Sequence, residues 1–216
     1  MNSNKHHLYK PKRITIYSAC MIIALSAAAF SFKDDNINTA SKENMTCELT
    51  PASKDSLASQ NAFLEVYKVL MSPRCMNCHP SGDVPLQGDD SHLHTQGVQR
   101  GPDGKGLYAL KCANCHQAQN TAGLNMPPGN PTWRLPAANM KLIFQGRSAK
   151  QLAMQLKDPK QNGGKTLEQL FHHVSEDSLV LWGWNPGDGR TLPPLSHDEF
   201  VKQFREWVDK GAVVPD

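Results

Sequence analysis

The sequence lacks a dominant charge of either sign, and this excludes one broad class of function. Its 216 residues contain 23 Lys and Arg against 20 Asp and Glu, a formal net charge of +3. Four basic residues, Lys5, Lys10, Lys12 and Arg13, lie at the N-terminus, so 19 basic and 20 acidic residues remain after them. Nucleic-acid binding needs a concentrated basic face. We therefore expect no nucleic-acid partner, and docking to a protein partner must rely on local charge patches.

The sequence has one long apolar segment, Ile14 to Phe32, which follows the polar and basic residues 1–13 and contains Ala27, Ala28 and Ala29. This layout is typical of a secretory signal peptide, so we predict a signal peptide over residues 1–32, cleaved after the alanines. Nineteen residues also suffice to span a bilayer, so an uncleaved N-terminal anchor is the alternative. Membrane attachment is expected only in that case. Either route exports the rest of the chain, and we expect a periplasmic location.

The sequence also lacks segments that predict long β-strands, and its only internal repeat is a pair of short motifs. The 15 Gly and 15 Pro residues predict many loops. Apolar residues recur at helical spacing in several segments, which predicts a mainly α, loop-rich fold. The longest expected helix covers residues 56–71 and is stopped by Pro73. Residues 33–55 are polar and are predicted to be a flexible linker, and residues 56–216 to form the folded domain.

Capping residues mark two further helix starts. Thr166 with Gln169, and Ser196 with Glu199, have the spacing of capping boxes, in which the two side chains each bond to the other residue's backbone. We expect the second of these helices to end at Gly211. The other expected elements are a helical lead at 107–110, a helix at 148–157 and an aromatic loop at 181–187.

Two five-residue stretches organise the chain: Cys-Met-Asn-Cys-His at 75–79 and Cys-Ala-Asn-Cys-His at 112–116. Cys-x-x-Cys-His is the attachment pattern of a c-type haem, in which two sulfurs add to the porphyrin vinyl groups and the His ligates the iron. We therefore predict two covalent haem c groups. The cofactor-binding residues are Cys75, Cys78, Cys112 and Cys115, and the proximal iron ligands are His79 and His116.

Two other cysteine chemistries compete with this interpretation. The four cysteines could bind one zinc ion, although the gap between the pairs is somewhat longer than in a usual zinc ribbon, or each pair could be a thiol redox centre. Neither chemistry needs a His directly after each pair. The motifs start only 37 residues apart, and a complete single-haem domain needs about twice that length. We therefore expect one cytochrome-c-like dihaem domain, with short helices packed around both haems.

A cysteine outside the motifs, Cys47, lies in the predicted linker. With Cys20 removed in the signal peptide and the motif cysteines bound to haem, Cys47 has no partner within the chain. A free thiol without a role is the simplest interpretation, and an intermolecular disulfide is the alternative.

The distal axial ligand of each iron decides the chemistry, because a Met raises the reduction potential relative to a second His and an open position allows peroxide chemistry. His173 flanks the apolar stripe of its expected helix at 100° per residue, whereas His172 points nearly opposite, so His173 is the better candidate. Met126 stands in a Met-Pro setting, only ten residues after His116. The full set of candidates is His92, His94, Met126, Met140, His172, His173 and His197.

Among the remaining candidates, His94 is preferred, with His92 as its alternative. Met140 stands beside Leu142 and other apolar residues, so core packing is the simpler interpretation. The preferred distal candidates are therefore His94, His173 and Met126.

From about Ser72 to Pro215 the chain resembles a family of exported dihaem c-type proteins often named as an isoquinoline 1-oxidoreductase subunit. Besides the two motifs, the matching stretches are Val98–Gly104, Met126–Gly129, Leu156–Pro159, Asn162–Gly164 and Leu179–Gly187. The resemblance implies covalent haem at both motifs and a cytochrome that receives electrons from a molybdenum hydroxylase acting on N-heterocycles or aldehydes. No segment resembles a molybdopterin or iron–sulfur domain, so this chain would be a non-catalytic electron-transfer subunit.

These observations predict an exported dihaem cytochrome c that carries single electrons from a periplasmic dehydrogenase to a downstream acceptor, with redox proteins as partners. A small dihaem peroxidase, with one iron left open, is the enzymatic alternative. A structural zinc module is the third.

Overall fold

The computed structural model describes residues 50–216, and its first element is the long helix α1 (Pro51–Leu70). Thr50 caps this helix, because its hydroxyl accepts a hydrogen bond from the backbone N–H of Ser53 at 3.3 Å. Pro51 stands in the first turn, where a missing N–H costs nothing. The helix therefore begins before Ser56, and the prediction of a linker through residue 55 was wrong over its last five residues.

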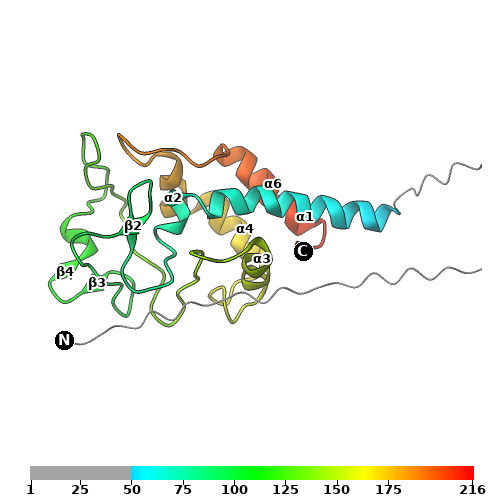
Figure 1. Ribbon diagram of the computed structural model, residues 1–216, viewed down its shortest axis with the longest axis horizontal. Coiled ribbons are helices and arrows are strands. Elements are labelled where there is room, and N and C mark those ends of the chain that lie inside the picture. Colours follow the sequence, from blue (N-terminus) through cyan, green and yellow to red (C-terminus); the bar gives the residue numbers. More distant parts are fainter. Residues whose placement is uncertain (1–49) are drawn as a thin grey trace, which may run out of the picture. The chain divides into compact units, whose positions relative to one another are not determined.

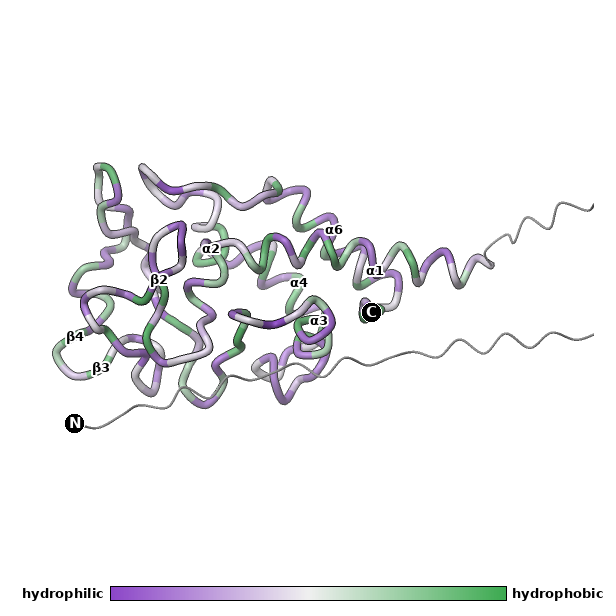
Figure 2. Tube along the Cα trace, in the orientation of Figure 1, coloured by the Kyte–Doolittle hydropathy of each residue, from purple (hydrophilic) through white to green (hydrophobic). Residues whose placement is uncertain are grey.

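Four helices build the core of the described chain. Helix α1 packs along α6 (His197–Asp209), and α3 (Ala149–Lys157) and α4 (Leu167–Glu176) pack against this pair (Figure 1). Hydrophobic residues alternate with hydrophilic ones along these helices (Figure 2), as expected for helices with one buried face. The largest buried side chains are aromatic: Phe63, Phe200, Phe204 and Trp207. The mainly α prediction is therefore confirmed.

Short elements connect the helices. They are the single-turn helices α2 (Pro73–Met76) and α5 (Ser178–Leu181), and the 3₁₀ helices η1 (Cys112–Asn114) and η2 (Trp182–Trp184). The aromatic loop expected at 181–187 therefore begins as 3₁₀ structure, because Asp177 caps α5 and the turn continues through Gly183.

Residues 80–147 form a loop-rich half with two very short antiparallel sheets (Figure 1). Strand β1 (Leu86–Gln87) pairs with β2 (His92–Leu93), so that Leu86 faces Leu93. Strand β3 (Gly106–Leu107) pairs with β4 (Leu110–Lys111), so that Gly106 faces Lys111.

The short helix expected at 107–110, leading into the second motif, was wrong: β3 and β4 form an antiparallel pair there. The chain reverses at Tyr108, which has a positive φ of 53°. Gly106 has a φ of 93°, and a Cβ there would lie 2.3 Å from the carbonyl oxygen of Leu110. A tight hairpin therefore forms where the apolar spacing had indicated a helical turn.

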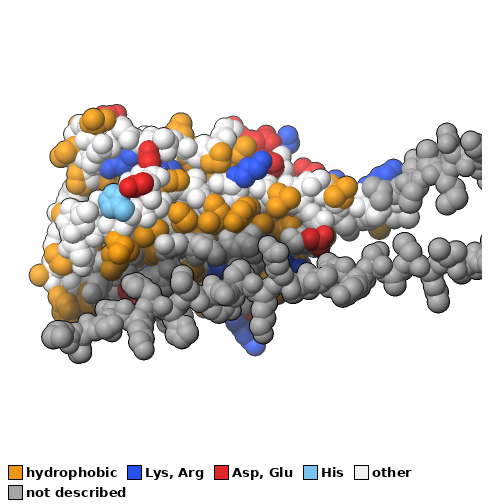
Figure 3. Space-filling view, viewed as in Figure 1, with side chains coloured by type: hydrophobic (Ala, Val, Ile, Leu, Met, Phe, Trp, Pro, Cys, Tyr) orange, Lys and Arg blue, Asp and Glu red, His pale blue; other side chains and the backbone are white. Residues whose placement is uncertain are grey.

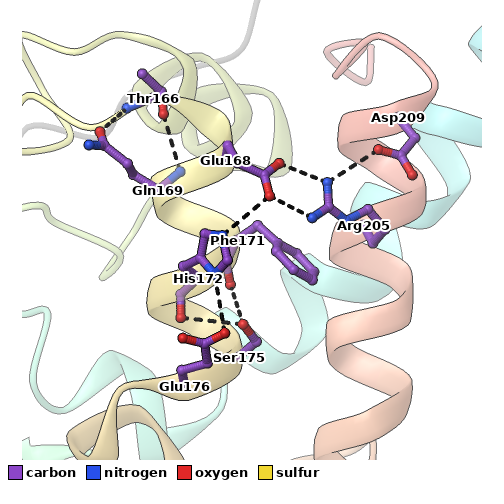
Figure 4. A network of polar contacts seen from close by, with 9 residues as sticks. All are labelled: Thr166, Glu168, Gln169, Phe171, His172, Ser175, Glu176, Arg205 and Asp209. Atoms are coloured by element: carbon purple, nitrogen blue, oxygen red, sulfur yellow. Dashed lines mark hydrogen bonds and ion pairs between the residues drawn. The ribbon is translucent and has the colours of Figure 1, made fainter.

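Helix α4 starts at the predicted capping box, since Thr166 accepts from the N–H of Gln169 and Gln169 accepts from the N–H of Thr166 (Figure 4). Arg205 on α6 holds both carboxylate oxygens of Glu168 at 2.8 Å, which ties the two helices together. The Arg205 guanidinium also lies 3.6 Å from the centre of the Phe171 ring.

Two further caps test the sequence predictions. Helix α3 starts at Ser148, which forms a complete capping box with Gln151. At α6, Ser196 accepts from the N–H of Glu199, but the Glu199 carboxylate accepts from Gln203 instead of returning a bond to Ser196. The second capping box was therefore predicted correctly in only one of its two bonds.

Some predictions fall on residues 1–49, outside the described residues: the signal peptide or anchor at 1–32, most of the linker and Cys47. Between residues 50 and 216, no helix is both long and apolar enough to cross a membrane.

On the face shown in Figure 3, hydrophobic side chains lie over both the loop-rich half and the helices, with acidic and basic side chains interspersed.

Candidate haem sites

The first motif lies on a cavity of about 380 Å³ lined by both the helices and the loop-rich half, which we call the core cavity. Cys75 is on α2, and Cys78 and His79 follow in the next turn. The remaining walls come mostly from apolar residues of α1, α3, α4, α6 and the loops before α3. They include Leu70, Leu142, Phe144, Leu156, Leu170, Val174, Phe200 and Phe204. Volumes of this order are typical of sites for organic ligands and cofactors.

The imidazole of His79 is held in one orientation. Its Nδ1 lies 2.7 Å from the carbonyl oxygen of Leu142, and its own carbonyl accepts the N–H of Phe144 at 2.9 Å. A carbonyl can only accept, so Nδ1 carries the proton and Nε2 keeps a free lone pair. Leu142 has a positive φ of 44°, a strained backbone for a leucine at the point where its carbonyl meets the ring.

Packing fixes the His79 ring further, and burial keeps it neutral. The Phe144 ring stacks on the imidazole at 4.0 Å between centroids and 14° between planes. Burial is the main cause that lowers the pKa of His79 to about 4; the Leu142 hydrogen bond opposes this shift, and the charges of His173 and Arg100 add to it. A neutral imidazole with one fixed N–H and one free nitrogen is the form that ligates a metal.

The two cysteines of the first motif are poor thiolates. Burial raises the pKa of Cys75 to about 12 and that of Cys78 to about 11. Reactive and zinc-binding cysteines depend on an accessible thiolate and a lowered pKa. The first motif is therefore a weak candidate for thiol redox chemistry, whereas an uncharged thioether fits this apolar wall.

His173 lies on the same cavity, as helical geometry predicted. Its Nδ1 is 3.1 Å from Asp177 Oδ2, which orients the ring. Burial lowers the pKa of His173, so the imidazole is neutral near pH 7. His172 instead lies exposed beside Glu168 and Glu176 (Figure 4) and does not line the cavity.

Met140 also lines the core cavity, contrary to the interpretation that it belongs to the packed core. Two of the seven distal candidates, His173 and Met140, thus share a cavity with His79. His173 is the one that acts on the pKa of His79.

The second motif has the same immediate surroundings as the first. Cys112 begins η1 and Cys115 follows its end, and His116 Nδ1 lies 2.7 Å from the carbonyl oxygen of Pro128. The ring of Trp133 stacks on His116 at 4.4 Å and 9°. Gly129, next to Pro128, lets the backbone pass close to the segment after His116, because a Cβ there would lie 2.0 Å from the carbonyl oxygen of Gln119. Burial lowers the pKa of His116, with a smaller effect of His94 in the same direction.

His94 stands opposite His116. The two ring centroids are 6.3 Å apart, with 64° between the ring planes. A histidine nitrogen binds a metal at about 2 Å, so two imidazoles on opposite sides of one metal have centroids about 6 Å apart. The Nδ1 of His94 is buried and has no hydrogen-bond partner. A ring nitrogen in this situation fits a missing metal bond.

The second site differs from the first in its exposure. Cys115 is exposed, and Cys112 and His116 are half-buried among loops. Trp133 meets Trp182 edge to face at 4.8 Å, and Trp182 lines an open surface groove of about 710 Å³. The two sites are close to each other, because the Cys112 thiol contributes to raising the pKa of Cys78.

The remaining candidates lie elsewhere. His92 is exposed and bonds to Asp90. His197 bonds to the carbonyl of Val174, which gives it a structural role at the start of α6. The Met126 side chain is 43% exposed and does not line the core cavity.

The residues of both motifs fit a covalently attached haem. Cys75, Cys78, Cys112 and Cys115 are all free of disulfides. Across the described residues, no group of three or more His, Cys, Asp and Glu side chains could hold a metal ion. A structural zinc ion needs four such ligands, whereas a haem iron takes two axial ligands from the protein. The orphaned His94 nitrogen and the apolar core cavity beside two free thiols are what a bound porphyrin would complete.

The chain matches no family model, no curated protein and no solved structure. Sequence reasoning missed Phe144 and Trp133, the two rings stacked on His79 and His116. No sequence pattern marks these two rings; they follow Leu142 and Pro128, whose carbonyls accept from the same two histidines.

Proposed function

We propose that the chain is an exported dihaem cytochrome c that carries single electrons. The observation that supports this best is the repeated environment of His79 and His116, each with Nδ1 on a backbone carbonyl, a stacked aromatic ring and a second imidazole nearby. Bound haem iron supplies one-electron chemistry, with a potential set by its axial ligands and burial. The protein orients four imidazoles and shields the first site from water.

We assign the distal ligands from the same geometry. His173 is the partner of His79, because both line the core cavity. His94 is the partner of His116, because of the 6.3 Å separation and the unpartnered nitrogen. Two imidazoles at each motif leave neither iron an open position, which favours electron transfer over the peroxidase alternative.

The redox partner meets the chain at the second site in this proposal, since Cys115 is exposed there. Electron tunnelling is efficient only over short distances, so the exposed centre is the one that a partner reaches. The resemblance to the isoquinoline 1-oxidoreductase subunits suggests a molybdenum hydroxylase as donor, in the periplasm.

The test is to produce the chain in a host that attaches c-type haem and to measure its mass after denaturation. Two retained porphyrins are expected. Loss of all porphyrin mass on denaturation would reject the proposal. Paramagnetic resonance should then show two low-spin irons, whereas a high-spin iron together with turnover of hydrogen peroxide would support the peroxidase.

Neighbouring histidines provide matched controls for the ligand assignment. His173→Ala and His94→Ala should each convert one of the two irons from low spin to high spin, which removes about half of the low-spin signal. His172→Ala and His92→Ala should leave both irons unchanged. Conversion of an iron by Met140→Ala, together with no effect of His173→Ala, would make Met140 the ligand instead.

A further inference from the structure

Two cations line the core cavity without an anionic partner. Arg134 and Lys165 belong to the lining together with Cys75 and His79. Both lower the pKa of His173 by their charge, so both lie close to the proposed distal ligand. Among the described residues, neither side chain forms an ion pair or a hydrogen bond. We call Arg134 and Lys165 the cavity cations.

The backbone of Lys165 is held by a buried amide. Asn162 is 2% exposed, and its Oδ1 accepts the N–H of Lys165 at 2.8 Å. Its Nδ2 donates to the carbonyl of Lys165 at 2.8 Å and to that of Leu156 at 2.7 Å. Gly163 takes a φ of 82°, which lets the chain turn tightly around this amide. The position of Lys165 at the cavity is therefore fixed by the fold.

The acidic residues on the cavity already have other partners. Asp177 accepts from His173 and from the N–H of Leu179. Asp103 accepts from the N–H of Lys105. Neither carboxylate pairs with Arg134 or Lys165, so the cavity cations remain free for an anionic ligand.

We propose that Arg134 and Lys165 form a carboxylate-binding subsite for the two propionates of the haem attached at Cys75 and Cys78. This rests on the proposed function. Thioether bonds hold the vinyl edge of a porphyrin at the cysteines, and its propionates leave from the opposite edge. Arginine and lysine bind carboxylates through charge-assisted hydrogen bonds.

The subsite also sets the potential of this haem. Positive charge near the iron disfavours the oxidised form, which carries one more positive charge than the reduced form. Removing the cavity cations therefore makes the potential more negative. At a separation of roughly 10 Å and an effective dielectric of about 20, each charge changes the reduction equilibrium by about tenfold. For one electron this is about 59 mV.

The test is a redox titration of the holoprotein in Arg134→Gln, Lys165→Gln and the double variant. Each single variant should shift one of the two haem steps by about tenfold and the double variant should shift it by about a hundredfold. That step should be the one that persists when Cys112 and Cys115 are replaced. Resonance Raman bands of propionate bending should change with it. Arg134→Lys with Lys165→Arg keeps both charges and should restore most of the potential. Lys150→Gln is the matched control, an exposed lysine of α3 outside the cavity.

The outcomes separate the subsite from the function. If both haems are attached and neither potential moves in the double variant, the subsite is wrong and the cytochrome stands. An equal shift in Lys150→Gln also overturns the subsite, because a general surface charge effect would explain it. If the parent chain carries no porphyrin mass, both the function and the subsite fail.

Discussion

The two Cys-x-x-Cys-His motifs have matching first neighbours and contrasting surroundings. His79 and His116 each place Nδ1 at 2.7 Å from a backbone carbonyl and stack on one aromatic ring. The carbonyls come from unrelated segments, Leu142 and Pro128. The ring orientation that a ligating histidine needs is therefore built twice, by different local structure.

The surroundings of the two motifs differ. The first motif faces a cavity walled by four helices, whereas the second lies in loops with Cys115 exposed. The orientation of each motif histidine is thus set by segments outside the motif, and the burial of each motif is set by its tertiary surroundings. Matched changes at the two sites should therefore have unequal effects.

The largest effect is expected from removing the attachment residues. The variant Cys75→Ala with Cys78→Ala should lose one haem and leave the core cavity unfilled, which costs about 5 kcal/mol or more for an apolar void of this size. The variant Cys112→Ala with Cys115→Ala should lose one haem with a much smaller loss of stability. Denaturation followed by circular dichroism measures both, with mass spectrometry to count haems. Equal losses of stability would remove the contrast between the sites.

A smaller effect is expected at the stacked aromatic rings. Phe144→Leu should destabilise the fold by about 1 to 3 kcal/mol, because Phe144 is 5% exposed and belongs to the core cluster. Trp133→Leu should cost less, since Trp133 is only half-buried, and should act mainly on the spectrum of the second haem. Thermal melts and paramagnetic resonance of the two variants distinguish these responses. If Trp133→Leu destabilised the fold more than Phe144→Leu, the structural core would lie around the second motif instead.

The smallest effect is the difference between the two reduction potentials. The first haem should have the higher potential, since burial disfavours the charged oxidised iron and the buried cations Arg74 and Arg100 lie near Cys78. A separation of about tenfold in the equilibrium, about 59 mV for one electron, is expected. A titration of each cysteine double variant assigns the two steps. A higher potential at the exposed second site would contradict this reasoning.

Much of the helical half could be predicted from the sequence. The apolar stripes and caps of α3, α4 and α6 are local patterns, and helical geometry separated His173 from His172. The start of α1 could not be predicted, because the residues directly after Pro51 are polar and carry no apolar stripe. The amphipathic signal begins only later in that helix.

The loop-rich half could not be predicted in the same way. The hairpin at 106–111 depends on positive φ at Tyr108 and on the missing side chain of Gly106, which carry no periodic signal. The carbonyls of Leu142 and Pro128 and the rings of Phe144 and Trp133 are brought to the histidines by long-range backbone contacts. Such pairings depend on the assembled fold and leave no trace in spacing.

The closure of the core cavity has a consequence for biogenesis. Cys75 and Cys78 come early in the chain, but part of the wall opposite them comes from α4 and α6, up to Phe204. An attachment enzyme needs access to both sulfurs. In the proposed cytochrome, maturation must therefore act on the exported chain before its C-terminal helices dock, and folding of the helical half waits for the porphyrin.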